Sequence, residues 1–416
     1  MKQIFRIGII TLLGAMMVQA AETRIWTSRK GSNLEAQLLN VEGEKVTLLT
    51  PESRELELKI EDLSLADRQY LVEYGGADPK IVASGELGAP ELEVKIDSKT
   101  FKKLDETLKL GEHSEALTFE LLETEHFLIA SDGIRQQPIA ETAERMWHGM
   151  AFEHMNFRKD WGDRRMLVLM VEDRENFTAL GNWYRASLEA RGVSDDVIKR
   201  SKATWEEVGA TGLSLTDELI SEYKLHDRAT VFNIREDRAY KKDMSSFPVH
   251  VIAGALLGKQ MGGVSDYGSD GYFSVVTGFA YFKEIKLTKK TETSQIDAAG
   301  SQFDEITKSR GFEDGTSWAK TLRKLVKKGD VEPNFEALLS WKSQDLDPEK
   351  LVLIYSFAHY CNSTPDRLAG FAKMVRRVET SDQIPEAIEF ARLMGFESVE
   401  DLQKDWTEFV SSTAFK

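Results

Sequence analysis

The chain has 416 residues, of which 54 are basic and 69 acidic, and its formal net charge at pH 7 is −15. Nucleic acids and anionic lipid surfaces repel such an acidic chain, so neither is expected as a partner. The single cysteine, Cys361, excludes an internal disulfide. Stability must therefore come from a buried core, which a chain of this length can form in roughly two or three domains.

The first twenty residues, MKQIFRIGIITLLGAMMVQA, have the order of an export signal. Lys2 and Arg6 precede an apolar run, and small residues follow it up to Ala20. The run is too short to span a bilayer, and no stop-transfer segment follows. We therefore expect residues 1–20 to be a cleaved signal peptide, with an uncleaved anchor as the alternative. The mature protein would then be periplasmic or extracellular, with no integral membrane segment.

Residues 21–76 predict a compact first domain. Three segments alternate apolar and polar side chains, as half-buried strands do: 34–39, 45–49 and 55–60. Ser64 can cap a short helix, with Asp67 three residues later. Strands and a helix in so short a stretch favour a small β-barrel.

Residues 77–115 are rich in glycine, proline and charge, and we expect a linker with one edge strand at 91–96. Residues 116–416 predict one larger α+β domain that becomes helical toward its end. Its expected strands fall within 116–132, 164–172 and 229–234, and its expected helices include 139–157, 247–263, 271–285, one starting at Thr364–Pro365 and one capped by Ser398 with Asp401.

The first domain carries an ordered set of residues typical of one known module: Arg24, Trp26, Gly31, Ala36, Val46, Leu48, Leu63, Ser64, Asp67 and Tyr70. In this set it resembles the SLA1 homology domain 1 (SHD1). The resemblance implies an SH3-like barrel that binds protein segments. Trp26 is then a candidate for peptide contact, although a barrel of this size also needs an aromatic residue at its centre.

The larger domain contains three segments, in this order, that are typical of exported zinc peptidases: TEHFLIASD, VEDRENF and LQKDWTEFV. In the order of its parts it resembles a gluzincin, the peptidase MA-like group. Such enzymes carry an HExxH helix, whose two histidines bind zinc from one helical face while the glutamate activates water. A glutamate from the next helix is the third ligand.

This sequence departs from that pattern at three of the four functional positions. His250 fits the first ligand, but Val251 stands at the base, Gly254 at the second ligand and Thr277 at the third. One imidazole does not hold a catalytic zinc, and valine cannot transfer a proton. The resemblance therefore implies a degenerate peptidase domain with no metal, no cofactor and no catalytic residues.

The favoured hypothesis is an exported, non-catalytic protein that binds a protein or peptide of unknown identity, a pseudopeptidase rather than an enzyme. Two alternatives stay open. The first is an active hydrolase or metallopeptidase with a relocated site, and the second is a structural envelope protein. A bound zinc, or a convergent cluster of catalytic side chains, would favour the first alternative.

Overall fold

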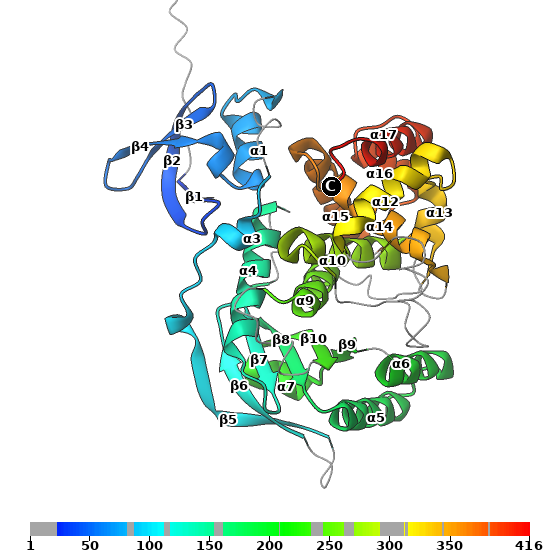
Figure 1. Cartoon of the computed structure of the whole chain (residues 1–416). Coiled ribbons are helices and arrows are strands. Elements are labelled where there is room, and N and C mark those ends of the chain that lie inside the picture. Colours follow the sequence, from blue (N-terminus) through cyan, green and yellow to red (C-terminus); the bar gives the residue numbers. More distant parts are fainter. Residues whose placement is uncertain are drawn as a thin grey trace, which may run out of the picture.

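A computed structural model gives the fold of this α+β protein (Figure 1). It describes residues 23–80, 87–111, 117–153, 161–207, 209–233, 244–261, 270–291, 312, 315–342, 345–381 and 383–416. The expected signal peptide, residues 1–20, lies outside the described residues.

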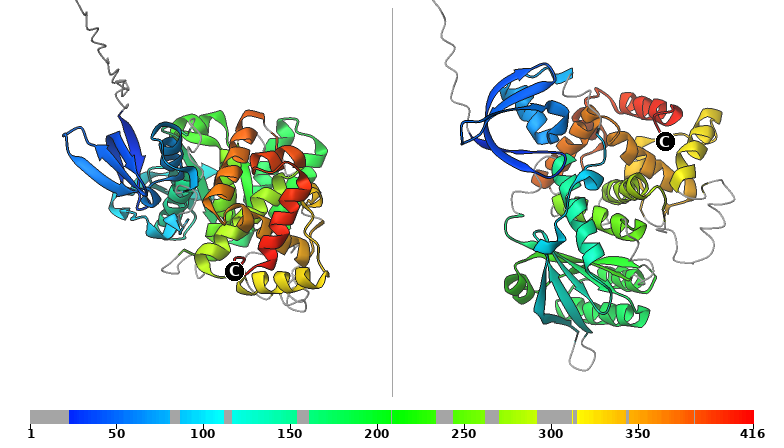
Figure 2. Two further views of the ribbon diagram at one scale, coloured as in Figure 1. Left: turned by 90° about the horizontal axis from the view of Figure 1, so that it is seen from above. Right: turned by 60° about the vertical axis from the view of Figure 1, so that its left-hand side comes forward.

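The N-terminal unit is a four-stranded antiparallel sheet whose strands lie side by side in chain order. These are β1 (Arg24–Thr27), β2 (Asn33–Glu42), β3 (Lys45–Leu49) and β4 (Glu55–Lys59). The three strands predicted from alternation are therefore confirmed. Helix α1 (Leu65–Tyr74) packs on the sheet after the turn η1 (Ile60–Asp62), as Figure 2 shows.

The sheet is not a closed barrel in the part of the chain that the structure describes. Its two ends, β1 and β4, do not pair with each other, and one isolated bridge joins Ser28 to Leu63. The core is nevertheless compact, because Trp26, Val46 and Leu71 are almost fully buried. In place of the expected barrel, these residues form a small open sheet covered by a helix.

Residues 87–111 contain more structure than a linker. The predicted strand at 91–96 is wrong, because helix α3 spans Pro90–Glu93 and proline fits the first turn of a helix. After the turn η2 (Ser98–Thr100), the charged stretch that follows forms strand β5 (Lys102–Leu110). Only Leu108 and Leu110 of this strand are buried, so its exposed residues look like a solvated linker in the sequence.

Strand β5 opens a second sheet of six strands in the order β5-β6-β7-β8-β10-β9. The other members are β6 (Leu117–Glu123), β7 (Phe127–Ser131), β8 (Arg165–Val171), β9 (Ala210–Ser214) and β10 (Leu225–Asn233). The central strands β7, β8 and β10 run parallel, while β5, β6 and β9 pair antiparallel with their neighbours. The sheet is therefore mixed, and β5 and β9 are its edges.

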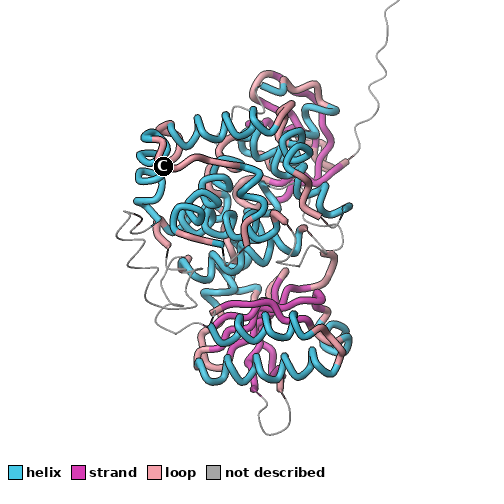
Figure 3. The backbone as a smooth tube through the Cα atoms, turned by 90° about the vertical axis from the view of Figure 1, so that its right-hand side faces the viewer, coloured by secondary structure: helices cyan, strands magenta, loops and turns pink. Residues whose placement is uncertain are grey.

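Helices cover both faces of this sheet (Figures 1 and 3). Residues of α4 (Gln137–Glu153) and α9 (Ser246–Gln260) join one face in a large core. Residues of α5 (Arg174–Ala190), together with Trp205 of α6 (Asp195–Glu207), join the other. Strand β8 is buried on both faces, which explains its continuous apolar run.

The large core continues from α9 into the helical C-terminal part. The remaining helices are α7 (Asp217–Tyr223), α10 (Tyr272–Thr288), α12 (Gly315–Lys328), α13 (Phe335–Ser340), α14 (Pro348–Cys361), α15 (Pro365–Ser381), α16 (Ala387–Leu393) and α17 (Val399–Ser411). Ser398 caps α17 by accepting the Asp401 N–H, as predicted. No helix of the described residues has the length and apolar character needed to cross a bilayer.

Candidate functional site

His250 lies in the first half of α9, where the sequence predicts the remnant of a zinc ligand. Its Nδ1 atom is 3.0 Å from Oε2 of Glu284, and its ring meets Tyr281 edge-on at 4.5 Å. Both partners belong to α10, which packs along α9. The histidine is 5% exposed and the Glu284 side chain is fully buried. The pair is therefore an interior hydrogen bond between two helices.

None of the other three expected positions carries a side chain that ordinarily binds zinc. The Val251 side chain packs against the core. A Cβ atom on Gly254 would sit 3.6 Å from Val276 and 3.7 Å from Ala280, so this position faces α10 at ordinary packing distance. Thr277 is buried, and Tyr281 and Glu284, which contact His250, lie four and seven positions further along α10.

The contact that the sequence analysis missed is Glu284. It lies on the same helical face as Thr277 and Tyr281, seven and three residues later, so helical spacing alone could have marked it as a candidate. It supplies one carboxylate to one histidine. Within the described residues, no group of three or more histidine, cysteine, aspartate or glutamate side chains is placed to hold a metal ion.

Trp26, the candidate for peptide contact, is 1% exposed. Its Nε1 atom donates to the carbonyl oxygen of Ala36 at 3.0 Å, and its ring meets Tyr70 edge-on. A tryptophan with its polar atom satisfied and its ring covered is a core residue. The structure therefore removes Trp26 from the accessible surface.

Next to Trp26 lies an accessible group that we call the arginine–tyrosine surface: Arg24, Tyr70 and Tyr74. The Arg24 guanidinium lies 4.0 Å from the centre of the Tyr70 ring, and the Tyr70 and Tyr74 ring centres are 4.8 Å apart. Tyr74 is 70% exposed, which is high for a large aromatic side chain. Strand β1 and helix α1 thus present one continuous stack at the surface.

The buried carboxylate of Asp67 holds the Arg24 side chain of this stack in place. This carboxylate accepts hydrogen bonds from Arg24 at 2.7 Å, from the Thr27 N–H at 2.8 Å and from the Ser64 hydroxyl at 2.7 Å. Burial raises the pKa of Asp67, and these hydrogen bonds and the charge of Arg24 oppose that effect. The Ser64–Asp67 cap predicted from the sequence is confirmed, and it also positions Arg24.

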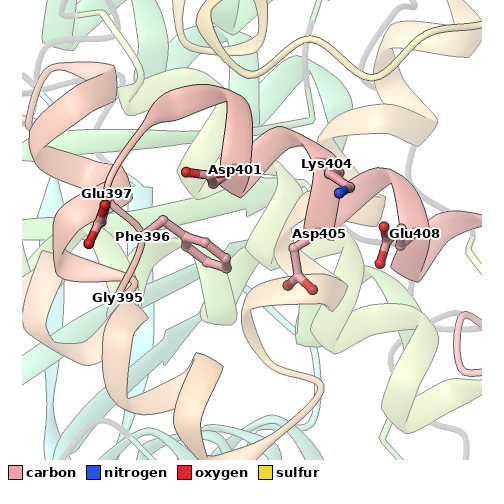
Figure 4. Close-up of a pocket in the computed structure, with 7 residues that line it drawn as sticks. All are labelled: Gly395, Phe396, Glu397, Asp401, Lys404, Asp405 and Glu408. Atoms are coloured by element: carbon pink, nitrogen blue, oxygen red, sulfur yellow. The ribbon is translucent and has the colours of Figure 1, made fainter.

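A second candidate site, which we call the acidic hollow, lies over α17 and the turn before it (Figure 4). It has a volume of about 340 Å³ and is lined by Gly395, Phe396, Glu397, Asp401, Lys404, Asp405 and Glu408. Asp405 accepts from Tyr360 at 2.6 Å and from Arg367 at 2.7 Å, and Asp401 bonds to Ser398. Glu397 and Glu408 are exposed, so the rim favours a cation.

A buried charge cluster holds the segment that follows the N-terminal unit. Lys283 of α10 has no exposed side-chain surface and bonds to Glu91 of α3 and Glu153 of α4. Lys286 adds a contact of 3.2 Å to Glu153. Gly149 makes room for this arrangement, because a Cβ atom there would be 2.4 Å from the Glu91 side chain.

Further contacts turn residues 87–94 into a strap between the two parts of the molecule. Arg145 of α4 donates to the carbonyl oxygens of Glu91 and Val94 at 3.1 and 2.9 Å. From the N-terminal unit, Arg29 donates to the Leu87 carbonyl at 2.7 Å. The Arg29 carbonyl in turn lies 3.3 Å from Nε2 of His148 on α4. These contacts attach the N-terminal unit to the part of the molecule that starts at β5 (Lys102–Leu110), which we call the body.

Comparisons with models of known protein families, with curated proteins and with solved structures found no match to this chain.

Proposed function

We propose that this is an exported, non-catalytic protein whose SHD1-like N-terminal unit binds a protein or peptide segment. The body is then a gluzincin-like domain without a zinc site. The observation that carries the proposal is the arginine–tyrosine surface, a preformed and accessible stack of Arg24, Tyr70 and Tyr74.

The chemistry of this surface suits recognition of an extended segment. Tyrosine and arginine are among the residues that contribute most to binding energy at protein interfaces. Their rings and the guanidinium plane offer apolar area with polar edges, and they lose little conformational freedom on binding when already stacked. Because Asp67 and Tyr70 already hold Arg24, a ligand meets an ordered surface.

The body supports the non-catalytic part of the proposal. Val251 offers no group that could move a proton, and the His250 imidazole is engaged with Glu284 in the interior. A catalytic zinc ordinarily takes three protein ligands, and the expected second and third positions are Gly254 and Thr277. Elemental analysis of the mature chain, before and after zinc reloading, tests this; one zinc per chain would contradict it.

Peptide selection followed by affinity measurement tests the binding role. A library of random peptides is displayed on phage and selected on the chain without residues 1–20, and the selected peptides are measured by fluorescence polarisation. We expect Tyr74→Ala to weaken binding by about tenfold or more, because it removes an exposed hot-spot ring. Leu39→Ala is the matched control, since Leu39 of β2 is a large apolar side chain that is 46% exposed on the same unit and is not one of the three stacked residues. Equal affinities of the two variants would contradict the proposal.

A further inference from the structure

Helix α12 carries the most basic surface of the helical part. Its sequence, GTSWAKTLRKLVKK, contains five basic residues and no acidic one, in a chain of net charge −15. Trp318 and Leu322 are buried and fix one side of the helix against the core. The exposed side carries what we call the lysine stripe: Lys320, Lys324, Lys327 and Lys328. The spacing of these four residues places them on one face.

Contacts within the molecule do not account for this stripe. Some exposed lysines elsewhere meet carboxylates, such as Lys45 with Glu57 at 2.6 Å and Lys103 with Glu120 at 2.9 Å. Among the described residues, no carboxylate lies within 4.0 Å of the ammonium groups of the lysine stripe. The helix dipole stabilises cations in the last turn, and this effect explains Lys327 and Lys328 but not Lys320 and Lys324.

The matching charge is found on the neighbouring helix. Helix α12 packs against α17, and Arg323 of α12 donates to the Phe415 carbonyl just beyond α17. Helix α17 carries the acidic hollow, with Glu397 and Glu408 exposed at its rim (Figure 4). Basic and acidic surfaces therefore lie on two adjacent helices at one end of the molecule (Figure 1).

We propose that the lysine stripe binds the acidic hollow of a second copy of this chain. Because the stripe and the hollow lie on two helices that pack together, α12 and α17, a single two-fold axis can pair each stripe with the partner's hollow and close a dimer. At physiological salt, charges more than about 8 Å apart are screened, so the overall negative charge of the two chains opposes the contact only weakly. Exposed ion pairs are individually weak, and the dimer is accordingly reversible and salt-sensitive.

Sedimentation velocity of the chain without residues 1–20, over a range of concentrations, tests this dimer. We expect association at about 0.1 M salt and its loss at about 0.5 M. Lys324→Glu with Lys328→Glu should weaken association by about tenfold or more, and so should Glu397→Lys with Glu408→Lys. A mixture of these two variants should restore it, since each supplies the charge that the other lacks. Lys95→Glu with Lys99→Glu makes the same change of charge at other exposed lysines and should leave association unchanged.

Three results would overturn the proposal. The first is a wild-type chain that stays monomeric at every concentration and salt. The second is a control variant that weakens association as much as the stripe variant does. The third is a mixture of the two charge-reversed variants that fails to associate. Vesicles with and without phosphatidylglycerol provide a separate arm. Binding of a monomeric wild-type chain to the anionic vesicles, lost in the stripe variant, would assign the stripe to a lipid surface instead. Circular dichroism of each variant verifies that it is folded.

Discussion

Single buried charges make the strongest demands on this fold at the residue scale. Lys283 lies in the interior between Glu91 and Glu153. Burial alone lowers the pKa of a lysine, but the two carboxylates more than offset this effect and raise the pKa of Lys283. The ammonium therefore stays charged and depends on both partners. Breaking a buried pair is costly, because the remaining charge has no water to solvate it.

Replacing Lys283 with methionine keeps most of the volume of the side chain but leaves two carboxylates without their cation. We expect a loss of about 3–5 kcal/mol in the free energy of unfolding, measured by urea denaturation at pH 7. Lys286→Met is the control, since Lys286 contacts only Glu153 in this cluster and is partly exposed. A smaller loss for Lys283→Met than for Lys286→Met would contradict this assignment.

His359 gives the molecule a built-in sensitivity to acid. Burial, with a smaller effect of Lys286 and Lys289, lowers its pKa from 6.5 to about 4. The unfolded chain therefore binds more protons between these values, and stability falls as the pH drops from about 6.5 through about 4. We expect this residue to contribute a loss of about 3 kcal/mol across that window. In His359→Phe, which suits the surrounding aromatic rings, the pH dependence should flatten by that amount; denaturation curves of identical pH dependence would refute the prediction.

At the scale of elements, two glycines distinguish close helix packing from spare room. A Cβ atom on Gly278 of α10 would lie 2.4 Å from the backbone oxygen of Ile354 on α14, whereas one on Gly254 of α9 meets its neighbours at 3.6 Å or more. Gly278 therefore fixes the approach of α10 to α14. Gly254, at the expected second ligand position, leaves the space of about one methyl group between α9 and α10.

Alanine at these two positions should have effects of opposite sign. Gly278→Ala forces α14 away from α10, and we expect a destabilisation of about 2 kcal/mol or more. Gly254→Ala finds room and loses less backbone entropy on folding, so we expect a gain of about 0.5–1 kcal/mol. Thermal unfolding of both variants measures the difference, and a loss at Gly254 as large as that at Gly278 would count against this view of the packing.

Local signals in the sequence predicted the elements well where the physics is local. The Ser64–Asp67 and Ser398–Asp401 caps depend on residues three positions apart, and both are present. Helical spacing along α10 could mark Glu284 as a candidate, but its contact with His250 depends on how α9 and α10 pack together. Strand β5 was missed because its exposed face is as charged as a linker, and its pairing with β6 is a property of the sheet.

At the scale of the whole molecule, the strap at residues 87–94 couples the N-terminal unit to the body. It accepts hydrogen bonds from Arg29 on one side and from Arg145 on the other, and it places Glu91 beside Lys283. Leu65 of α1 also packs against Leu368 of α15, a direct apolar contact between the two parts. The surface formed by Arg24, Tyr70 and Tyr74 is therefore held in one orientation relative to the body.

Arg145→Ala tests the strap directly. The change removes two hydrogen bonds to backbone carbonyls of the strap, and we expect the amides of residues 88–94 to exchange with solvent at least about tenfold faster in hydrogen-exchange mass spectrometry. Arg377→Ala is the control, because Arg377 makes an exposed ion pair with Glu389, and both residues are far in the sequence from the strap. Unchanged protection of residues 88–94 in Arg145→Ala would show that the strap is held by other contacts.

The contacts of the strap also limit where the chain can be cut into stable fragments. The composition of residues 77–115 suggests a domain boundary there, and a fragment that starts at residue 116 would follow the division expected from the sequence. Such a fragment loses Glu91 and with it one of the two anions beside Lys283. It also loses β5, which exposes β6 as a new sheet edge for pairing with other chains. Residues 87–111 thus supply part of the interior of the body, and a cut at residue 116 separates groups that pack together.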